Sequence, residues 1–259
     1  MSLALPTSRN IVVPAGYFFF DEGPGAGELY IAETPEFKLT GSTDGIEILS
    51  EDGPVAETLV DKVTSVKRSA NFATKNITDD GYALFVMGDK TSKTTIVGSV
   101  TGKAINGGVA LKGGRWYQLG VDTTNPSGIR GIGSVAIKTG ATTHVLTTDY
   151  ILDAPTGRLY VVPGGGCDGA ICTSDYATTA TSWSQIASND TGPKRGSARF
   201  LSDNTEGENR DIFIPDCTIS PNGEVNMKGR GAAQQMGFNL KINKPDDGRA
   251  SVYVNGRAA

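Results

Sequence analysis

Side chains that build disulfide frameworks, metal centres and catalytic sites are scarce in this sequence. Its 259 residues include only three cysteines and one histidine. Three cysteines cannot all pair within one chain, so we expect free thiols at Cys167, Cys172 and Cys217. Cys167 and Cys172 are five positions apart and have no second cysteine pair or nearby histidine in the sequence, which argues against a zinc site. We therefore predict no metal ion and no cofactor.

Basic side chains are too few for a typical nucleic-acid binder. The chain has 24 lysine and arginine residues against 28 aspartate and glutamate residues, a net charge of −4. Tight DNA binding depends on neutralising many phosphates, so this balance argues against it. No apolar run approaches the ~20 residues that cross a bilayer, and residues 1–5 are too short and lack the basic start of a secretion signal. We expect a soluble protein, made in the cytoplasm, without membrane contact.

Catalytic patterns are equally scarce. His144 would have to serve any Ser-His-Asp triad, with Asp149 or Asp153 as the orienting acid. The G-x-S-x-G motif that exposes a nucleophilic serine is not present. His144 lies in a threonine-rich segment, where we expect an exposed or half-buried strand residue. We predict that the protein is not an enzyme and has no catalytic residues.

Glycine and proline, by contrast, are abundant. The 34 glycines and 12 prolines leave little room for long helices, so we predict a mainly β fold, a sandwich or barrel with long loops. Residues 28–39 alternate in polarity, and Pro35 interrupts them, which is typical of an edge strand or a bulge. Residues 61–77 contain a strand with one dry face, formed by Val66, Ala70 and Phe72.

One short flanking α-helix is predicted in residues 76–88. Thr78 can cap its first N–H groups, and Asp79 and Asp80 suit the positive end of the helix dipole. An apolar stripe follows, and we expect Gly88 to end the helix.

Residues 157–176, GRLYVVPGGGCDGAICTSDY, pose the question of a phosphate-binding loop. Such a loop leads into a helix whose N–H groups face the anion, whereas a β-branched and polar run follows here. We therefore interpret the glycines as a hairpin connection. Residues 220–223, Ser-Pro-Asn-Gly, predict another hairpin turn.

Residues 44–61 form an acidic stretch without a basic residue until Lys62. Asp-Gly pairs at residues 44–45 and 52–53 favour turns, so we predict a long acidic loop. Loops longer than ~12 residues are uncommon in compact domains unless they have a function. The acidic side chains are Asp44, Glu47, Glu51, Asp52, Glu57 and Asp61.

Several segments, taken in order, resemble the tail tube proteins of long-tailed bacteriophages. They are residues 27–41, the acidic stretch, residues 66–88, 147–165, 197–229 and 234–246. The pattern includes Y-x-x-D-x-x-T-G-R-x-Y at residues 150–160 and I-P-D-x-x-x-S-P-N-G at residues 214–223. Two departures are an added segment at about residues 91–140 and the lack of a separate C-terminal immunoglobulin-like domain.

The resemblance implies a structural protein of the virion tail, assembled in the host cytoplasm. Six copies would form a ring whose inner strands make a continuous barrel, and rings would stack around a tape-measure protein. Tail tip and tail terminator proteins would be further partners, and DNA would pass through the lumen without sequence-specific binding. The implied organisation is an N-terminal arm at residues 1–26, a tail-tube domain at residues 27–246 and a C-terminal strand or tail at residues 247–259.

Two hypotheses about the surface follow. We expect the acidic stretch to dock onto an adjacent ring, where Lys67, Arg68 or Arg115 could meet its carboxylates. The alternative function is a β-sandwich adhesin or carbohydrate-binding module that uses Trp116, Tyr117 or Trp183 as a stacking platform. The tube proteins of contractile tails and the type VI secretion tube protein are closely related alternatives to the tail tube function.

Overall fold

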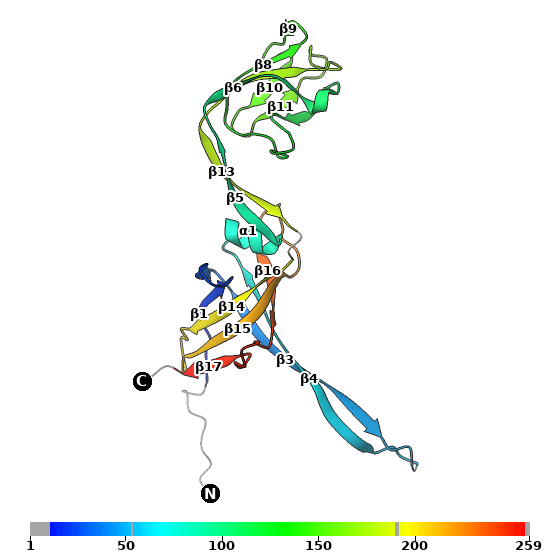
Figure 1. Cartoon of the computed structure of the whole chain (residues 1–259), viewed down its shortest axis with the longest axis vertical. Helices are drawn as coiled ribbons and strands as arrows, with labels where there is room; N and C mark the ends of the chain where they lie inside the picture. Colours follow the sequence, from blue (N-terminus) through cyan, green and yellow to red (C-terminus); the bar gives the residue numbers. More distant parts are fainter. Residues whose placement is uncertain (1–10, 53, 190–191, 257–259) are drawn as a thin grey trace. The chain divides into compact units, whose positions relative to one another are not determined.

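The computed structural model describes residues 11–52, 54–189 and 192–256. The chain divides into two compact units. Unit 1 comprises the described residues up to Lys90 and from Ile186 onward, and unit 2 comprises residues 91–185. The predicted mainly β fold with one short α-helix is confirmed within the described residues (Figure 1). Within those residues, no helix is both long and apolar enough to span a membrane.

Unit 1 is built on one antiparallel sheet with the order β2-β1-β14-β15-β16-β4-β3. A further strand, β17, pairs with β15. The strands are β1 (Gly16–Asp21), β2 (Glu28–Ile31), β3 (Glu36–Leu49), β4 (Thr58–Thr74), β14 (Lys194–Ser202), β15 (Arg210–Pro221), β16 (Met236–Ile242) and β17 (Tyr253–Gly256). The sheet is curled. Strands β3 and β14 are not neighbours in it, yet Phe37 of β3 stacks on Phe200 of β14 with ring centroids 5.4 Å apart.

The core of unit 1 is rich in phenylalanine. Phe18 and Phe20 alternate inward on β1 and are 1% and 0% exposed, and Phe72 and Phe238 join them from β4 and β16. This corrects the prediction that residues 1–26 form an arm, because residues 16–21 pair with β14 and β2. The turn glycines after residue 22 obscured the buried alternation before it. Residues 1–10 lie outside the described residues.

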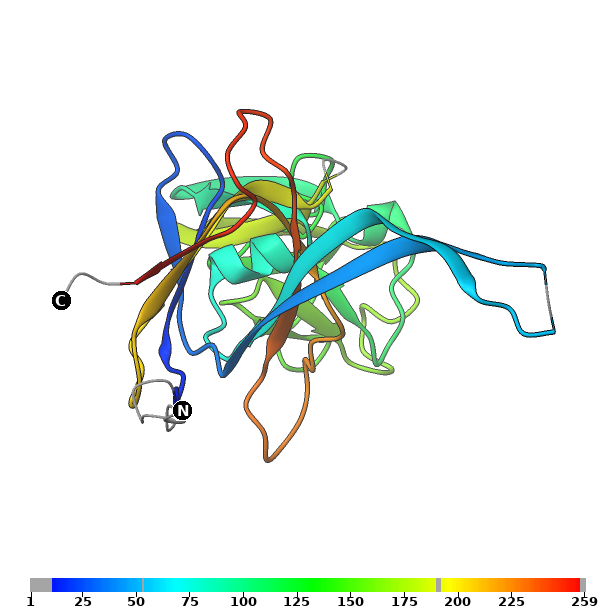
Figure 2. The ribbon, with the colours of Figure 1, turned by 90° about the horizontal axis from the view of Figure 1, so that it is seen from below.

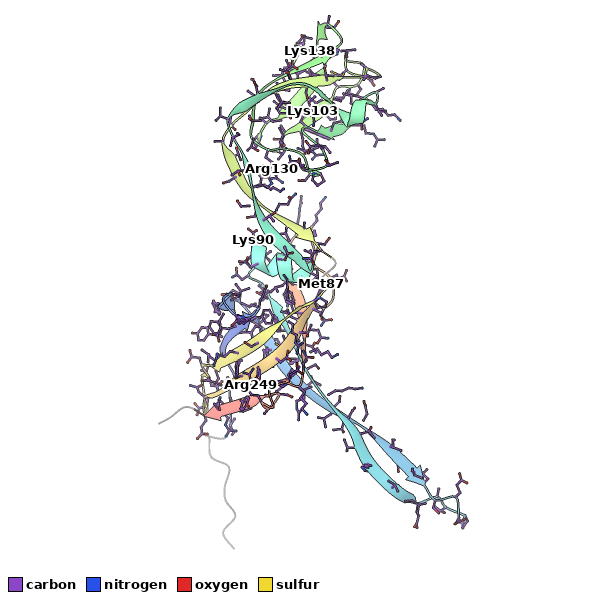
Figure 3. All side chains as sticks on the ribbon, in the orientation of Figure 1. Met87, Lys90, Lys103, Arg130, Lys138 and Arg249 are labelled. Carbon is purple, nitrogen blue, oxygen red and sulfur yellow. The ribbon has the colours of Figure 1, made fainter. Side chains whose placement is uncertain are left out.

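The single α-helix, α1 (Asp79–Phe85), packs on the same core. The Thr78 hydroxyl accepts the Gly81 N–H at 3.0 Å, as the sequence predicts, and Leu84 is buried. The helix end differs from the prediction, because the left-handed residue is Met87, with φ 52°, rather than Gly88 (Figure 3). Gly88 instead begins β5, where a side chain would collide with the carbonyl oxygen of Ala187.

The chain leaves unit 1 through β5 (Gly88–Thr95) and returns through β13 (Thr181–Ser188), which pair with each other. Unit 2 has the sheets β6-β12-β8-β9 and β10-β11-β7. Its elements are β6 (Gly98–Ala104), the 3-10 turn η2 (Asn106–Gly108), β7 (Trp116–Gln118), β8 (Ile132–Thr139), β9 (Thr142–Thr143), β10 (Tyr150–Asp153), β11 (Arg158–Val161) and β12 (Thr173–Thr178).

Unit 2 is larger than the added segment predicted at residues 91–140. The reason is a long-range pairing: β12 inserts between β6 and β8, so residues up to 178 complete the same sheet. Its own buried cluster includes Leu119, Ile137, Leu159 and Val161. The segment predicted as a C-terminal strand or tail contains a strand, because β17 pairs with β15 in the sheet of unit 1, while residues 257–259 lie outside the described residues.

One predicted hairpin connection is wrong, and another has a longer loop than predicted. Residues 162–172 carry the chain from β11 in one sheet of unit 2 to β12 in the other, although a strand and not a helix follows, as expected. Residues 222–235 form a long connection between the paired strands β15 and β16, which meet at Pro221 and Phe238. Residues 153–157 do form a hairpin turn, since Asp153 of β10 pairs with Arg158 of β11.

Candidate assembly surface

The acidic stretch is a β-hairpin rather than a loop. Asp44 and Glu47 lie in β3 and Asp61 lies in β4, while Glu51, Asp52 and Glu57 lie between the two strands. The two strands pair from Glu36–Ala73 out to Leu49–Thr58, with register shifts near Asp44 and Ile48. Turn residues suggested a loop, but the β-branched and apolar residues between them continue the ladder.

The outer part of this hairpin extends beyond the sheet of unit 1. Residues 68–73 of β4 pair with both β3 and β16, whereas the outer part of β4, before residue 68, pairs with β3 alone in the described chain. Figure 2 shows the resulting two-stranded ribbon in blue and cyan. We call residues 43–66 the hairpin arm.

The hairpin arm has two chemically different faces. In the continuous register of residues 45–48 with 60–63, Ile46, Ile48 and Val60 lie on one face and are 56%, 51% and 45% exposed. Glu47 and Asp61 lie directly opposite each other on the other face. Opposed like charges destabilise a strand pair, and exposed apolar side chains at neighbouring positions form a patch suited to a partner. Both faces therefore favour contact with another surface.

The predicted basic counterparts lie in different places. Lys67 Nζ is 2.5 Å from Asp44 Oδ2 within the same hairpin, and this contact holds the pKa of the Asp44 carboxyl below its usual range. Arg68 lies on β4 opposite Gly41, and Arg115 belongs to unit 2. Both arginines are exposed, and within the described residues neither forms an ion pair. The structure thus joins only one of the three bases to the acidic set.

An open sheet edge accompanies the hairpin arm. β3 is the last strand of its sheet, is 14 residues long and has no strand on its outer side in the described chain. An edge of this length presents unpaired backbone N–H and C=O groups, which natural proteins normally cover or shorten. A second copy of the chain could pair with this edge.

His144 follows β9 and is buried, so it is neither a strand residue nor exposed or half-buried, contrary to the sequence prediction. Its side chain is 6% exposed, and Nδ1 lies 3.7 Å from Asp149 Oδ2. Asp153 instead accepts the hydroxyl of Thr156. The fold also brings His144 next to Cys167 and Cys172, which the sequence separates from it. All three cysteines are buried free thiols, as predicted, and burial raises the pKa of Cys167 to about 12.

The three aromatic residues of the alternative function have unequal exposure. Trp116 is exposed, with 46% of its surface accessible, whereas Tyr117 and Trp183 are less exposed and are half-buried. Trp116 and Tyr117 line an open hollow of about 670 Å³ together with Lys103 and Asn106. Arg158 lies over the Trp116 ring at 5.2 Å, and Tyr160 lies beside it at 5.3 Å. Only Trp116 therefore has the exposure that a stacking platform needs.

Comparisons with known proteins assign no family. No protein-family model matches the sequence, and no curated protein matches it either. The function is therefore inferred from the sequence motifs and from the geometry described above.

Proposed function

We propose that this chain is a structural subunit of the tail tube of a long-tailed bacteriophage. Six copies would close into a ring, and rings would stack around a tape-measure protein between tail tip and tail terminator proteins. DNA would later pass through the lumen of the virion tail. The observation that carries the proposal is the hairpin arm, whose apolar face and outer edge have no partner within the described chain.

A second copy of the chain is the partner that the edge favours. Open edges promote uncontrolled pairing unless closure removes them. A ring closes the edge of every subunit in the same way, and head-to-tail contact along the ring axis then permits a filament. The long edge of β3 is compatible with this arrangement.

The hairpin arm itself needs a neighbour. An isolated two-stranded hairpin is marginally stable in water, and this one exposes Ile46, Ile48 and Val60 on one face. The opposite face has the carboxylates of Glu47 and Asp61, which form no ion pair within the described residues, although Glu47 accepts the hydroxyl hydrogen of Thr58 at 2.6 Å. Arg68 and Arg115, which have no ion pair in the described structure, are suitable counterparts on an adjacent copy. Docking of the arm would cover apolar area and neutralise its charge together.

The charge distribution suits a conduit for DNA. Unit 2 has seven lysine and arginine residues against five aspartates, a net charge of +2. The remaining 17 basic and 23 acidic residues give the rest of the chain a net charge of −6. A lumen poor in lysine and arginine avoids the phosphate contacts that would hold DNA in place. The acidic part of the chain contains the strands that we assign to the ring.

The test uses the purified full-length protein and variants of the hairpin arm. We expect negative-stain images to show rings or tubes, and sedimentation to show large species that grow with concentration. The double variant Ile48→Thr/Val60→Thr keeps strand-forming residues but removes the apolar contact, so we expect it to stay monomeric with unchanged circular dichroism. The control is Val63→Thr, on the acidic face of the same register. A wild-type protein that stays monomeric at every concentration would overturn the proposal.

The exposed Trp116 and its hollow favour one second candidate, a carbohydrate-binding module. Sugar rings stack on exposed tryptophan faces, but Arg158 already occupies one side of this ring. Binding to a glycan array that Trp116→Ala abolishes, in a protein that forms no rings, would support this candidate instead.

A further inference from the structure

Unit 2 contains a buried cluster of three potential metal ligands that come from separate segments. His144 follows β9, Cys167 lies in the connection between β11 and β12, and Cys172 directly precedes β12. One ring nitrogen and the two sulfur atoms all lie within 4.8 Å of one another. Both cysteines are 0% exposed. Sequence spacing gives no signal for this cluster, because only the pairing of β12 with β8 brings the three residues together.

The spacing of these atoms is close to that of a tetrahedral zinc site. Zinc–sulfur bonds of about 2.3 Å and zinc–nitrogen bonds of about 2.0 Å place neighbouring ligand atoms roughly 3.5 to 3.8 Å apart. Contraction from within 4.8 Å therefore needs shifts of about 1 Å, which small side-chain rotations provide. Two thiolates and one imidazole are also the ligand types that zinc and cobalt prefer.

The histidine ring is held in place on its Nδ1 side. Asp149 Oδ2 lies 3.7 Å from Nδ1, and the two carboxylate oxygens accept the N–H groups of Val145 and Gly166, both at 2.7 Å. Gly166 fits against the ring because a Cβ there would lie 2.7 Å from Nδ1. A carboxylate beside the nitrogen that does not bind metal is the usual companion of a metal-binding histidine.

The other ring nitrogen, Nε2, contacts Thr139, which also contacts the sulfur atom of Cys172. The Thr139 hydroxyl oxygen lies 2.8 Å from His144 Nε2 and 3.4 Å from Cys172 Sγ. If Nε2 bound a metal ion, this hydroxyl could donate its hydrogen to the Cys172 thiolate instead. The pocket thus has an orienting carboxylate on one side of the ring and a hydroxyl that can stabilise a bound thiolate on the other.

We propose that His144, Cys167 and Cys172 bind one Zn²⁺ ion, with Asp149 as a positioning residue. His144 would bind through Nε2, and each thiol would lose its proton on binding. A non-protein ligand such as water would fill the fourth position. The ion would tie β9 to both ends of residues 167–172 and so stabilise unit 2. This site is independent of the assembly proposal, because none of its residues lies in unit 1.

Cys217 provides a matched control. It is also 0% exposed, but it lies on β15 in unit 1 and its Sγ contacts the carbonyl oxygen of Gly196 at 3.4 Å. Replacing it removes one buried thiol without touching the cluster. Any effect of thiol loss in general, as opposed to loss of a ligand, would therefore appear in Cys217→Ser.

The experiment measures metal binding by the full-length protein. After dialysis against Zn²⁺ and then metal-free buffer, we expect one zinc per chain in the wild type and in Cys217→Ser, and a loss of at least 10-fold in affinity in Cys172→Ser. Co²⁺ should give the ligand-field bands of a tetrahedral ion and a sulfur-to-cobalt charge-transfer band. Asp149→Asn should weaken zinc affinity by about 10- to 100-fold while both thiols remain.

Two results would overturn the proposal. One is wild-type protein that binds no zinc or cobalt after full reduction. The other is a Cys167–Cys172 disulfide, seen as a loss of two thiols in mass spectrometry of protein purified without reductant, together with no metal binding once it is reduced. Because these measurements use the wild-type chain, they decide the matter even if a cysteine variant does not fold.

Discussion

The sheets of units 1 and 2 are antiparallel, but the two units differ in how their exposed apolar residues are distributed. Unit 2 surrounds its own buried cluster with two sheets, and its exposed apolar residues are scattered. Unit 1 also has a core, but it concentrates nine large exposed apolar residues between Leu39 and Val66. Since scattered apolar residues are normal on any surface and a concentrated patch is not, unit 1 is the part whose surface favours a partner.

Removing each region in turn should give the largest difference in ring formation. We expect replacement of residues 92–184 by a short turn between β5 and β13 to leave ring formation intact, because the arm and the open edge belong to unit 1. Replacement of residues 44–64 by a short turn should abolish it. Electron microscopy and sedimentation compare the two deletions. The opposite pattern would transfer the assembly role to unit 2.

Truncation of core side chains should show whether the units unfold separately. Phe238→Ala in unit 1 should cost about 3–5 kcal/mol of unfolding free energy, and Leu159→Ala in unit 2 about 2–5 kcal/mol, because both side chains are fully buried. Trp116 and Trp183 both lie in unit 2, so tryptophan fluorescence reports that unit alone.

In urea titrations, Leu159→Ala should lower the fluorescence midpoint, and Phe238→Ala should lower only the circular dichroism midpoint. If either variant shifted both signals equally, the two units would unfold as one.

The ion pair of Arg195 and Asp216 should make unit 1 sensitive to acid. Arg195 donates to both Asp216 oxygens, at 2.8 and 2.5 Å, which together with Asn243 lowers the pKa of this buried carboxyl. Because the folded-state pKa lies below the unfolded value of ~3.9, the stabilisation is complete above that pH and is lost as pH falls through the lower value.

Asp216→Asn should therefore cost about 1.5–3 kcal/mol at neutral pH and remove this acid dependence. Denaturant titrations at pH 7 and below pH 4 measure both effects. An equal loss for the variant at both pH values would contradict the assignment.

The smallest expected effect concerns the cap of α1. Thr78→Ala removes the hydroxyl that accepts the Gly81 N–H and should cost about 1 kcal/mol, whereas Thr78→Ser should keep most of the stability. The fluorescence midpoint of unit 2 should not change in either variant. A similar loss with serine would show that the methyl group, rather than the cap, matters.

Sequence patterns succeeded where the cause was local. The glycine and proline content predicted a mainly β chain, and the cap at Thr78 with its acidic first turn placed the helix. Pro35 was predicted to mark an edge strand or a bulge, and it lies where the chain passes from β2 to β3. Each of these features depends on a few neighbouring residues and on their backbone preferences, so the sequence alone determines them.

The features that the sequence did not predict depend on pairing between strands that are distant along the chain. The sequence located the acidic residues but not the hairpin that carries them, because turn signals at residues 44–45 and 52–53 outweighed the strand residues between them. The insertion of β12 between β6 and β8 set the size of unit 2 and brought His144 to Cys167 and Cys172. The sequence by itself determined the mainly β character of the described chain and the position of α1. Only the tertiary structure decided which strands become neighbours, because that choice depends on burying side chains that are distant along the chain.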